Sequence, residues 1–288
     1  MIEHTKKYKQ HVSTTTAAFG FYTLIFCFFK IAIDIYSIHK DSPRYGGVVL
    51  IVAFSLIFSI FMYSRNLTAT KNELICGNAD HTIAASATII PFFVIYTLGV
   101  LTLQVFPGWK RCFSNTFGTG FATTFLNLND TMSNWIKTYT PEGNNQSSTN
   151  TNLDTLNYML ETNPETLFNE LIDDQTIGDD NGITWKSFDV IDRMLKAKFN
   201  IQPVNDANTN ENKDNLPSNE DRTRLDSIKK ELLTCVSIRD TIGLCIWLYG
   251  LGLITLQVGF NAILSQDCSS FKRSHEDVQE YIKERLKA

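Results

Sequence analysis

Residues 83–106, IAASATIIPFFVIYTLGVLTLQVF, form an apolar stretch that decides the fold of this chain. The stretch carries no charged side chain and exceeds the roughly 20 residues that a helix needs to cross about 30 Å of hydrocarbon. Similar stretches run from Ala17 to Ile38, Gly47 to Ser64 and Thr241 to Leu264. Open strands would leave backbone groups unsatisfied in lipid, and none of the stretches alternates as a barrel strand does. The sequence therefore predicts an all-α integral membrane protein with four transmembrane helices, three N-terminal and one C-terminal.

The four spans divide the 288 residues into five segments. We expect a three-span membrane domain (1–106), an interfacial aromatic segment (107–137), a polar insert (138–240), a fourth transmembrane helix (241–265) and a charged helical tail (266–288). Within the insert, 138–152 and 205–219 are rich in Asn and other small polar residues, which favours flexible linkers. Helical patterns near 153–160, 164–172 and 185–199 predict a small helical soluble body. A net charge of −4 is too small to indicate nucleic-acid binding.

The first span combines a basic lead with a charged pair inside its apolar run. Three lysines precede it, Lys6, Lys7 and Lys9, but no small-residue cleavage site follows, so we expect a retained span and not a signal peptide. Lys30 and Asp34 lie one helical turn apart on one face. Charges inside a membrane are costly and often functional. Because both lie near the end of the span, anchoring or helix packing is favoured over ion conduction, with Lys30 reaching toward the headgroups.

An aromatic segment follows the third span and predicts an amphipathic helix at the membrane interface. Pro107 and Gly108 end the span, Trp109 suits the interfacial belt, and Lys110 with Arg111 would meet lipid phosphates. Four phenylalanines then recur every four residues, and three further apolar residues continue approximately the same face: Phe113, Phe117, Phe121, Phe125, then Leu128, Met132 and Trp135. Such a stripe could contact either lipid or protein.

Pro91 lies inside the third span, where it removes a backbone hydrogen bond and predicts a kink. The small residues that precede it, Ala84 to Ala87, allow a neighbouring helix to approach closely. A kink of this kind can act as a hinge, but neighbouring helices commonly satisfy the freed carbonyl.

Metal and catalytic motifs are not found in this sequence. Asp179 to Gly182 resemble part of a calcium loop between two helices, but with Gly182 in the sixth position, Ile177 and Phe188 occupy the first and twelfth. A solvated acidic turn is the better interpretation. The five histidines are scattered, and no phosphate-binding loop or nucleophile elbow occurs. We therefore expect no catalytic residues, no metal, no cofactor and no enzymatic activity.

Six cysteines are present, and four of them flank spans. Cys76 and Cys268 lie on the side of the termini, whereas Cys112 and Cys235 lie on the side of the insert. Either pair would be able to bridge if its compartment is oxidising. Cys27 and Cys245 lie inside spans, and no cysteine spacing is typical of a metal site.

The segment CGNADHTIAASATIIPFFVIYTLGVLTLQVFPGWKRCFSNTFG, residues 76–118, resembles a multi-span membrane protein family of the nucleocytoplasmic large DNA viruses. An Asn-containing lead, a Pro within the span, and Pro-Gly-Trp followed by Phe-Ser-Asn-Thr-Phe-Gly carry the resemblance. The matching residues are Asn78, Pro91, Pro107, Gly108, Trp109, Phe113, Ser114, Asn115, Thr116, Phe117 and Gly118. The chain departs from the family pattern at Lys110, Arg111 and Cys112, where less charged residues are expected.

The resemblance implies a structural component of the virion, with the lipid bilayer and viral minor capsid proteins as its partners. The protein would lie in the internal membrane beneath an icosahedral shell, after insertion into a host endomembrane during assembly. Homo-oligomer formation is left open. Two other functions are compatible with the sequence: a small ion channel or transporter, in which Lys30, Asp34 and Pro91 would line a path, and a membrane assembly factor that is left out of the finished virion.

Overall fold

The computed structural model describes residues 2–40, 45–71, 79–106, 108–137, 164–171, 175–177, 183–185, 190 and 219–265. Four helical stretches in these residues are long and apolar enough to cross a membrane: Gln10–His39, Gly47–Thr70, His81–Leu103 and Asp226–Leu264. Each contains or largely overlaps one of the four predicted spans. The prediction of a helical membrane protein with four such helices is therefore confirmed at this level.

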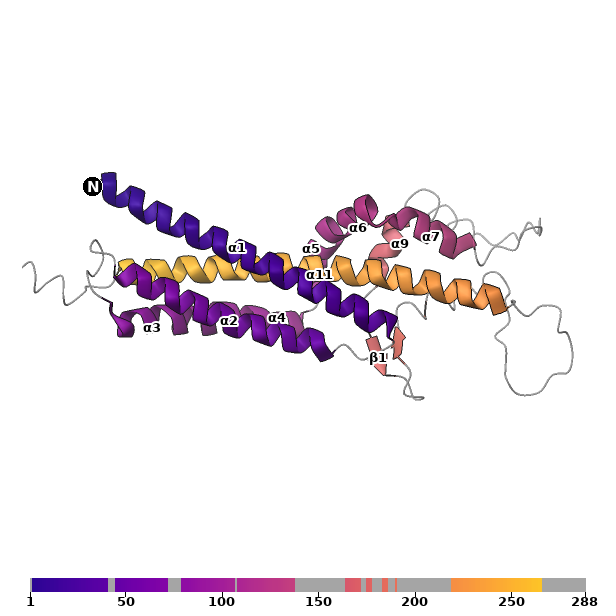
Figure 1. Cartoon of the computed structure of the whole chain (residues 1–288), viewed down its shortest axis with the longest axis horizontal. Helices are drawn as coiled ribbons and strands as arrows, with labels where there is room; N and C mark the ends of the chain where they lie inside the picture. Colours follow the sequence, from indigo (N-terminus) through magenta and orange to yellow (C-terminus); the bar gives the residue numbers. More distant parts are fainter. Residues whose placement is uncertain are drawn as a thin grey trace, which may run out of the picture. The chain divides into compact units, whose positions relative to one another are not determined.

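The helices extend well beyond the predicted spans. Helix α1 runs from Ile2–His39, α2 from Tyr45–Thr70, and α11 from Asn219–Leu264. The third stretch comprises α3 (His81–Pro91), the π-helix η1 (Phe92–Thr97) and α4 (Leu98–Val105). In Figure 1, α11 is the long orange-to-yellow helix, drawn without a break. The fourth span thus continues without interruption into the polar part of the chain.

The chain divides into two compact units. Unit 1 comprises Met1–Phe28, Val48–Lys110 and Cys245–Ala288, and unit 2 comprises Phe29–Gly47 and Arg111–Leu244. Both α1 and α11 contribute residues to each unit. The division therefore falls within helices and not at the boundaries of the expected segments.

Aromatic rings fill the interior of unit 1. Phe19 of α1 is fully buried, and its ring lies 4.7 Å from that of Phe58 in α2 and 5.7 Å from that of Tyr249 in α11. Phe58 in turn contacts Tyr96 of η1, with ring centroids 4.8 Å apart. Tilted and stacked rings at these distances add to the stabilisation from burial alone. Helices from four parts of the sequence therefore meet around one aromatic cluster.

Pro91 ends α3, and a π-helix follows it directly. Because proline has no N–H, it cannot donate to the carbonyl of Ala87, and a wider π-turn is a common consequence of such a gap. Helix α11 approaches closely here: a Cβ added to Gly259 would lie 2.8 Å from the Ala87 carbonyl oxygen. Farther along the span, Trp247 of α11 donates its indole N–H to the Gly99 carbonyl at 3.1 Å. The irregular third span is thus supported by α11 within unit 1.

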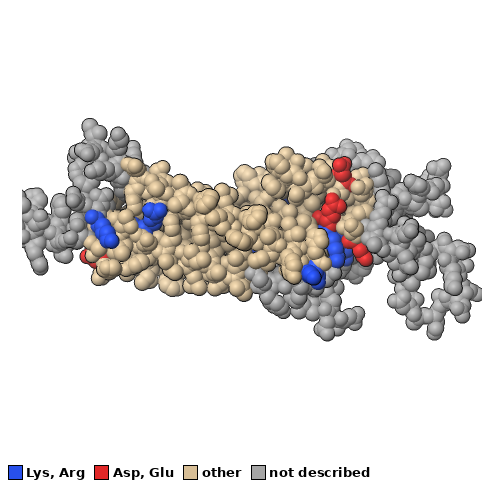
Figure 2. All heavy atoms as spheres, in the orientation of Figure 1, with Lys and Arg blue, Asp and Glu red and all other residues tan. Residues whose placement is uncertain are grey.

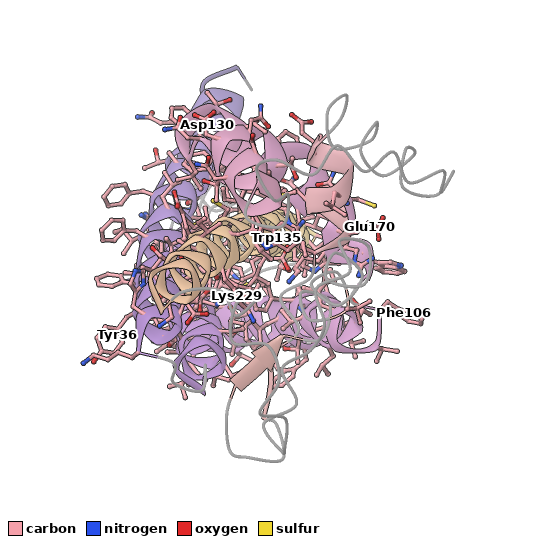
Figure 3. All side chains as sticks on the ribbon, turned by 90° about the vertical axis from the view of Figure 1, so that its right-hand side faces the viewer. Tyr36, Phe106, Asp130, Trp135, Glu170 and Lys229 are labelled. Atoms are coloured by element: carbon pink, nitrogen blue, oxygen red, sulfur yellow. The ribbon has the colours of Figure 1, made fainter. Side chains whose placement is uncertain are left out.

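Unit 2 contains short helices packed on α11. After α5 (Gly108–Phe113) come the π-helix η2 (Ser114–Gly118), α6 (Thr119–Phe125), α7 (Leu128–Lys137) and α9 (Pro164–Glu170). Their shared core includes Ala122, Met132, Trp135 and Phe168 with Leu232 and Val236 of α11. Figure 3 shows Trp135 beside α11, whereas Asp130 and Tyr36 point outward. Part of the polar insert is therefore packed directly against the fourth long helix.

The predicted continuous aromatic stripe is wrong beyond Phe125. Helix α6 ends there, and Asn127 adopts a left-handed conformation with φ 48°. Asparagine tolerates this conformation better than most residues. The carbonyl of Asn127 then accepts the first backbone hydrogen bonds of α7. As a result Leu128, Met132 and Trp135 are fully buried and do not continue the exposed face of Phe117, Phe121 and Phe125.

A small β-hairpin lies in the insert, before most of the helical pattern predicted at 185–199. Strands β1 (Gln175–Ile177) and β2 (Ile183–Trp185) pair antiparallel, with Gln175 opposite Trp185. Their β-branched residues favour strands. Trp185 therefore ends a strand and does not begin a helix, whereas residues 179–182 and most of 186–199 lie outside the described residues. The helix predicted at 164–172 is present as α9, while the predicted linkers, the pattern at 153–160 and the tail lie outside the described residues.

Substituting Gly259 with Ala should destabilise the protein, because the new methyl group would meet the Met62 side chain at 2.6 Å and the Ala87 backbone oxygen at 2.8 Å. Overpacking of this kind costs about 1–3 kcal/mol. The matched control is Gly250→Ala, since a Cβ there has no neighbour within 4 Å. Thermal unfolding in detergent should show a lower Tm for Gly259→Ala and an unchanged or higher Tm for Gly250→Ala. Equal values for the two variants would contradict the close helix packing.

Candidate functional site: buried charges along α11

Arg239 lies in the middle of α11 and is almost completely buried, with 2% of its side chain exposed. Its guanidinium donates to the carbonyls of Phe168, at 2.7 Å, and Leu171, at 2.5 Å, at the C-terminal end of α9. It also donates to the carboxylate of Asp240 at 2.9 Å and lies 4.9 Å from the centre of the Phe168 ring. A cation beside the last carbonyls of a helix is favourable because those groups lack partners within the helix. Arg239 therefore attaches α9 to α11.

A second charged pair lies in the same unit. Lys30 and Asp34 of α1 form an ion pair, and the hydroxyl of Thr241 in α11 donates to the same Asp34 oxygen at 3.0 Å. Asp34 is 1% exposed and Lys30 only 12%, so Lys30 does not extend into solvent as expected for a snorkelling lysine. The other Asp34 oxygen, Oδ1, is buried and accepts no hydrogen bond from the described residues. Through Thr241, this pair connects α1 to α11. Thr241 directly follows the Arg239–Asp240 pair in the sequence.

The π-helix η2 contacts α11 through two glycines. A Cβ added to Gly118 would lie 2.4 Å from the Arg239 carbonyl oxygen, and one added to Gly243 would lie 2.8 Å from the Ser114 backbone nitrogen. Ser114 and Gly118 are four residues apart on η2, and their partners Gly243 and Arg239 are four residues apart on α11. The later residue on η2 contacts the earlier one on α11. Helix η2 therefore runs antiparallel to α11, at backbone contact distance. The Ser114–Gly118 part of the segment that resembles the viral family provides this contact.

The residues predicted for the membrane interface occupy different environments. Gly108, Trp109 and Arg111 are exposed, Lys110 is half-buried, and Pro107 lies outside the described residues. Trp109 stacks on Phe106, with ring centroids 5.5 Å apart. Among the phenylalanines, Phe113 is half-buried, whereas Phe117, Phe121 and Phe125 are exposed. The interior of η2 and α6 is provided instead by the small residues Ser114, Gly118, Thr119 and Ala122.

The Cys112–Cys235 bridge that the topology allowed is not formed. Both thiols are free: Cys112 is exposed on α5, whereas Cys235 is buried in the core that α11 shares with α7 and α9. One sulfur thus lies on the surface and the other inside the packed core. Cys76 and Cys268 lie outside the described residues.

Among the residues that the structure describes, no group of three or more His, Cys, Asp or Glu side chains is placed to hold a metal ion. The Lys30–Asp34 pair belongs to unit 2 and Pro91 to unit 1, so the residues proposed for a conducting path are not gathered in one unit.

Sequence reasoning missed Arg239, Asp240 and Thr241 as a functional group. The available signal was the Arg-Asp pair directly before the predicted fourth span.

The chain matches no protein-family model, no curated protein and no solved structure. The resemblance of residues 76–118 to the viral membrane protein family therefore stays a prediction that rests on those residues.

Replacing Arg239 with Met should destabilise unit 2 strongly, because Asp240 would lose a buried partner and two α9 carbonyls would lose their donor. Removing one partner of a buried pair costs about 3–5 kcal/mol. The control is Arg111→Met, since Arg111 is exposed on α5. Limited proteolysis in detergent should cut near α9 faster in Arg239→Met and at the wild-type rate in Arg111→Met. Unchanged proteolysis of both variants would mean that Arg239 does not hold α9.

A double-mutant cycle tests the Lys30–Asp34 pair. Lys30→Met and Asp34→Asn should each destabilise the protein, while the double variant should lose less than the sum of the two. For contacting residues we expect a coupling free energy of about 0.5–3 kcal/mol. Unfolding titrations of the four proteins in mixed detergent micelles measure it. Additive losses would show that the two side chains act independently.

Proposed function

We propose that the protein is a structural membrane protein that fastens an internal viral membrane to the icosahedral capsid shell around it. Its four apolar helices would hold it in the bilayer, and unit 2 would present the insert to minor capsid proteins. The viral context rests on the resemblance of residues 76–118, and the mechanical role rests on the geometry of α11. No described group of residues suggests chemistry on a substrate.

The length of α11 is the observation that carries this proposal. Its 46 residues correspond to about 69 Å at 1.5 Å per residue, whereas the hydrocarbon core of a bilayer is about 30 Å thick. A helix of this length extends beyond the hydrocarbon on at least one side. Because one helix contains both the fourth span and the residues on which α7 and α9 pack, the insert would be linked to the membrane through α11.

Unit 2 supports the same role, since it fixes part of the insert to α11. Arg239 binds the end of α9, Thr119 of α6 donates to Asn169 of α9 at 2.6 Å, and Thr131 of α7 donates to Glu231 of α11 at 3.2 Å. Together with the buried core around Trp135, these contacts hold three short helices on one long one. A tether between two layers requires a rigid attachment of this kind.

Quantitative mass spectrometry of purified particles of the virus that encodes the chain tests the proposal. Peptides of the insert should be present at a constant ratio to the capsid proteins and should stay with the shells after detergent removes the lipid. Absence from purified particles would overturn the structural role and favour an assembly factor. Release of the whole chain with the lipid would show that it does not hold the shell.

A pair of glycine variants makes this measurement specific for unit 2. Gly118→Ala would place a methyl group 2.4 Å from the Arg239 carbonyl oxygen and separate η2 from α11, whereas Gly120→Ala meets nothing within 4 Å. We expect both variants in the membrane fraction of infected cells. Only Gly118→Ala should lose retention on detergent-treated shells, and equal retention would show that the packing of unit 2 is not needed for attachment.

A further inference from the structure

Three buried polar atoms of unit 1 have no hydrogen-bond partner among the described residues: His11 Nε2 and Thr15 Oγ1 of α1, and Asn66 Oδ1 of α2. The Thr15 and Asn66 side chains are fully buried. Buried polar groups in folded proteins nearly always have a partner, because an unpaired one loses its bonds to water without compensation. These three atoms therefore require a partner of their own.

The Thr15 hydroxyl does not bond to its own helix. Thr14 and Thr23, also on α1, donate to the backbone carbonyls four residues before them, at 2.8 and 2.9 Å. Threonine hydroxyls inside helices commonly find their acceptor in this way. Thr15 makes no such bond among the described residues. Its hydroxyl is therefore available to a group that lies between the helices.

The amide of Asn66 is held in one orientation. Its Nδ2 atom donates to Thr88 Oγ1 at 2.9 Å, and the Thr88 hydroxyl donates to the Ala84 carbonyl at 2.7 Å. A hydroxyl has one proton, so Thr88 can only accept from Asn66, which fixes the amide nitrogen on the side of Thr88. The unpartnered atom of Asn66 is therefore the oxygen, which accepts and needs a donor.

Contacts within unit 1 place the three groups near one another. The Phe19 ring of α1 packs on Phe58 of α2, with ring centroids 4.7 Å apart. About two turns earlier on α1, His11 interacts with the charge and the backbone of Arg65, about two turns later on α2. The two helices are therefore antiparallel here. Thr15 lies midway between these contacts, on the same side of α1 as His11 and Phe19.

Helix α11 closes another side of this region. A Cβ added to Gly259 would lie 2.6 Å from Met62 Cε and 3.3 Å from Asn66 Nδ2. The next residue of α11, Phe260, meets the His11 ring edge-on, with ring centroids 5.5 Å apart. His11 and Asn66 thus line the same turn of α11. The methyl group of the buried Met62 side chain lies beside the Asn66 amide.

The charges around this region favour a neutral ligand. Figure 2 shows blue side chains over the end of unit 1 at which α2 ends, where the described cations are Arg65 and Lys71. The Arg65 charge acts on His11 and would repel a bound cation. An anion would meet the Asn66 oxygen, which has no proton to donate. Water donates and accepts at once, and a buried water typically makes about three hydrogen bonds.

From these observations we propose that unit 1 contains an ordered water site between α1 and α2, formed by His11 Nε2, Thr15 Oγ1 and Asn66 Oδ1. The water donates to Asn66 and bonds to Thr15 and His11. Ordered water is one of the ways in which membrane proteins satisfy polar groups near a proline in a helix. Here Thr88, three residues before Pro91, positions the Asn66 amide. The proposal concerns unit 1 alone and does not depend on the viral function.

X-ray radiolysis of the full-length chain in detergent micelles tests the proposal, because radicals formed from an ordered water oxidise side chains that bulk oxidants do not reach. Met62 is the reporter, and Met132 in the apolar core of unit 2 is the matched control, since both are fully buried. Peptide mass spectrometry should show that radiolysis oxidises Met62 several-fold faster than Met132. Hydrogen peroxide, which acts from bulk solvent, should leave both methionines protected.

Variants at the site make the measurement specific. Thr15→Val removes the hydroxyl at nearly constant volume and should lower the radiolytic oxidation of Met62. Adding Asn66→Leu should lower it to the rate of Met132. The control is Thr14→Val, because Thr14 is exposed and bonds to its own helix. It should leave Met62 oxidation unchanged, and all variants should keep their protection from peroxide.

Three results would overturn the proposal. Equal protection of Met62 and Met132 from radiolysis would show that no ordered water lies beside Met62. Equal oxidation of Met62 in the wild type and in Thr15→Val would show that this hydroxyl does not hold the water. Oxidation of wild-type Met62 by peroxide would show that the region is open to bulk solvent and is not an ordered site.

Discussion

Unit 2 depends on the buried guanidinium of Arg239. Moving an unpaired cation out of water costs several kcal/mol, so a buried guanidinium needs a charged partner and hydrogen-bond acceptors. Two α9 carbonyls, the Asp240 carboxylate and the face of the Phe168 ring meet this requirement. Both carbonyls lie at the C-terminal end of α9, where the Phe168 oxygen also accepts the Leu171 backbone N–H at 3.1 Å. Arg239 thus joins the end of α9 to α11 through hydrogen bonds that its own burial requires.

Close backbone contact along α11 follows from a different constraint. In unit 1, bulky rings around Phe19 fill the space between helices, and Gly259 lets α11 approach the Ala87 carbonyl, to which Pro91 cannot donate. In unit 2, Gly118 and Gly243 bring η2 and α11 together where the surrounding residues are small. Small residues permit dispersion contacts between backbones, which are a main source of helix association where lipid surrounds the protein. Glycine placement therefore determines where α11 accepts a neighbour.

The four spans could be predicted from the sequence because length and composition alone distinguish them. The break at Asn127 could not, since Leu128, Met132 and Trp135 continue the spacing of the phenylalanines closely enough to imitate one helix. The left-handed conformation of Asn127 changes the direction of the chain, so that Leu128, Met132 and Trp135 point into the core. The β-hairpin was missed because three-residue strands carry little periodicity. Arg239 was missed because its partners are backbone carbonyls about 70 residues away in the sequence, and no side-chain pattern predicts such contacts.

The charged side chains at the centre of unit 2 occur in two ion pairs. Each buried cation lies beside a buried carboxylate: Lys30 with Asp34, and Arg239 with Asp240. Each pair is internally neutral, and Thr241 adds a further hydrogen bond to Asp34. Pairing of this kind lowers the cost of burying charged side chains next to an apolar span.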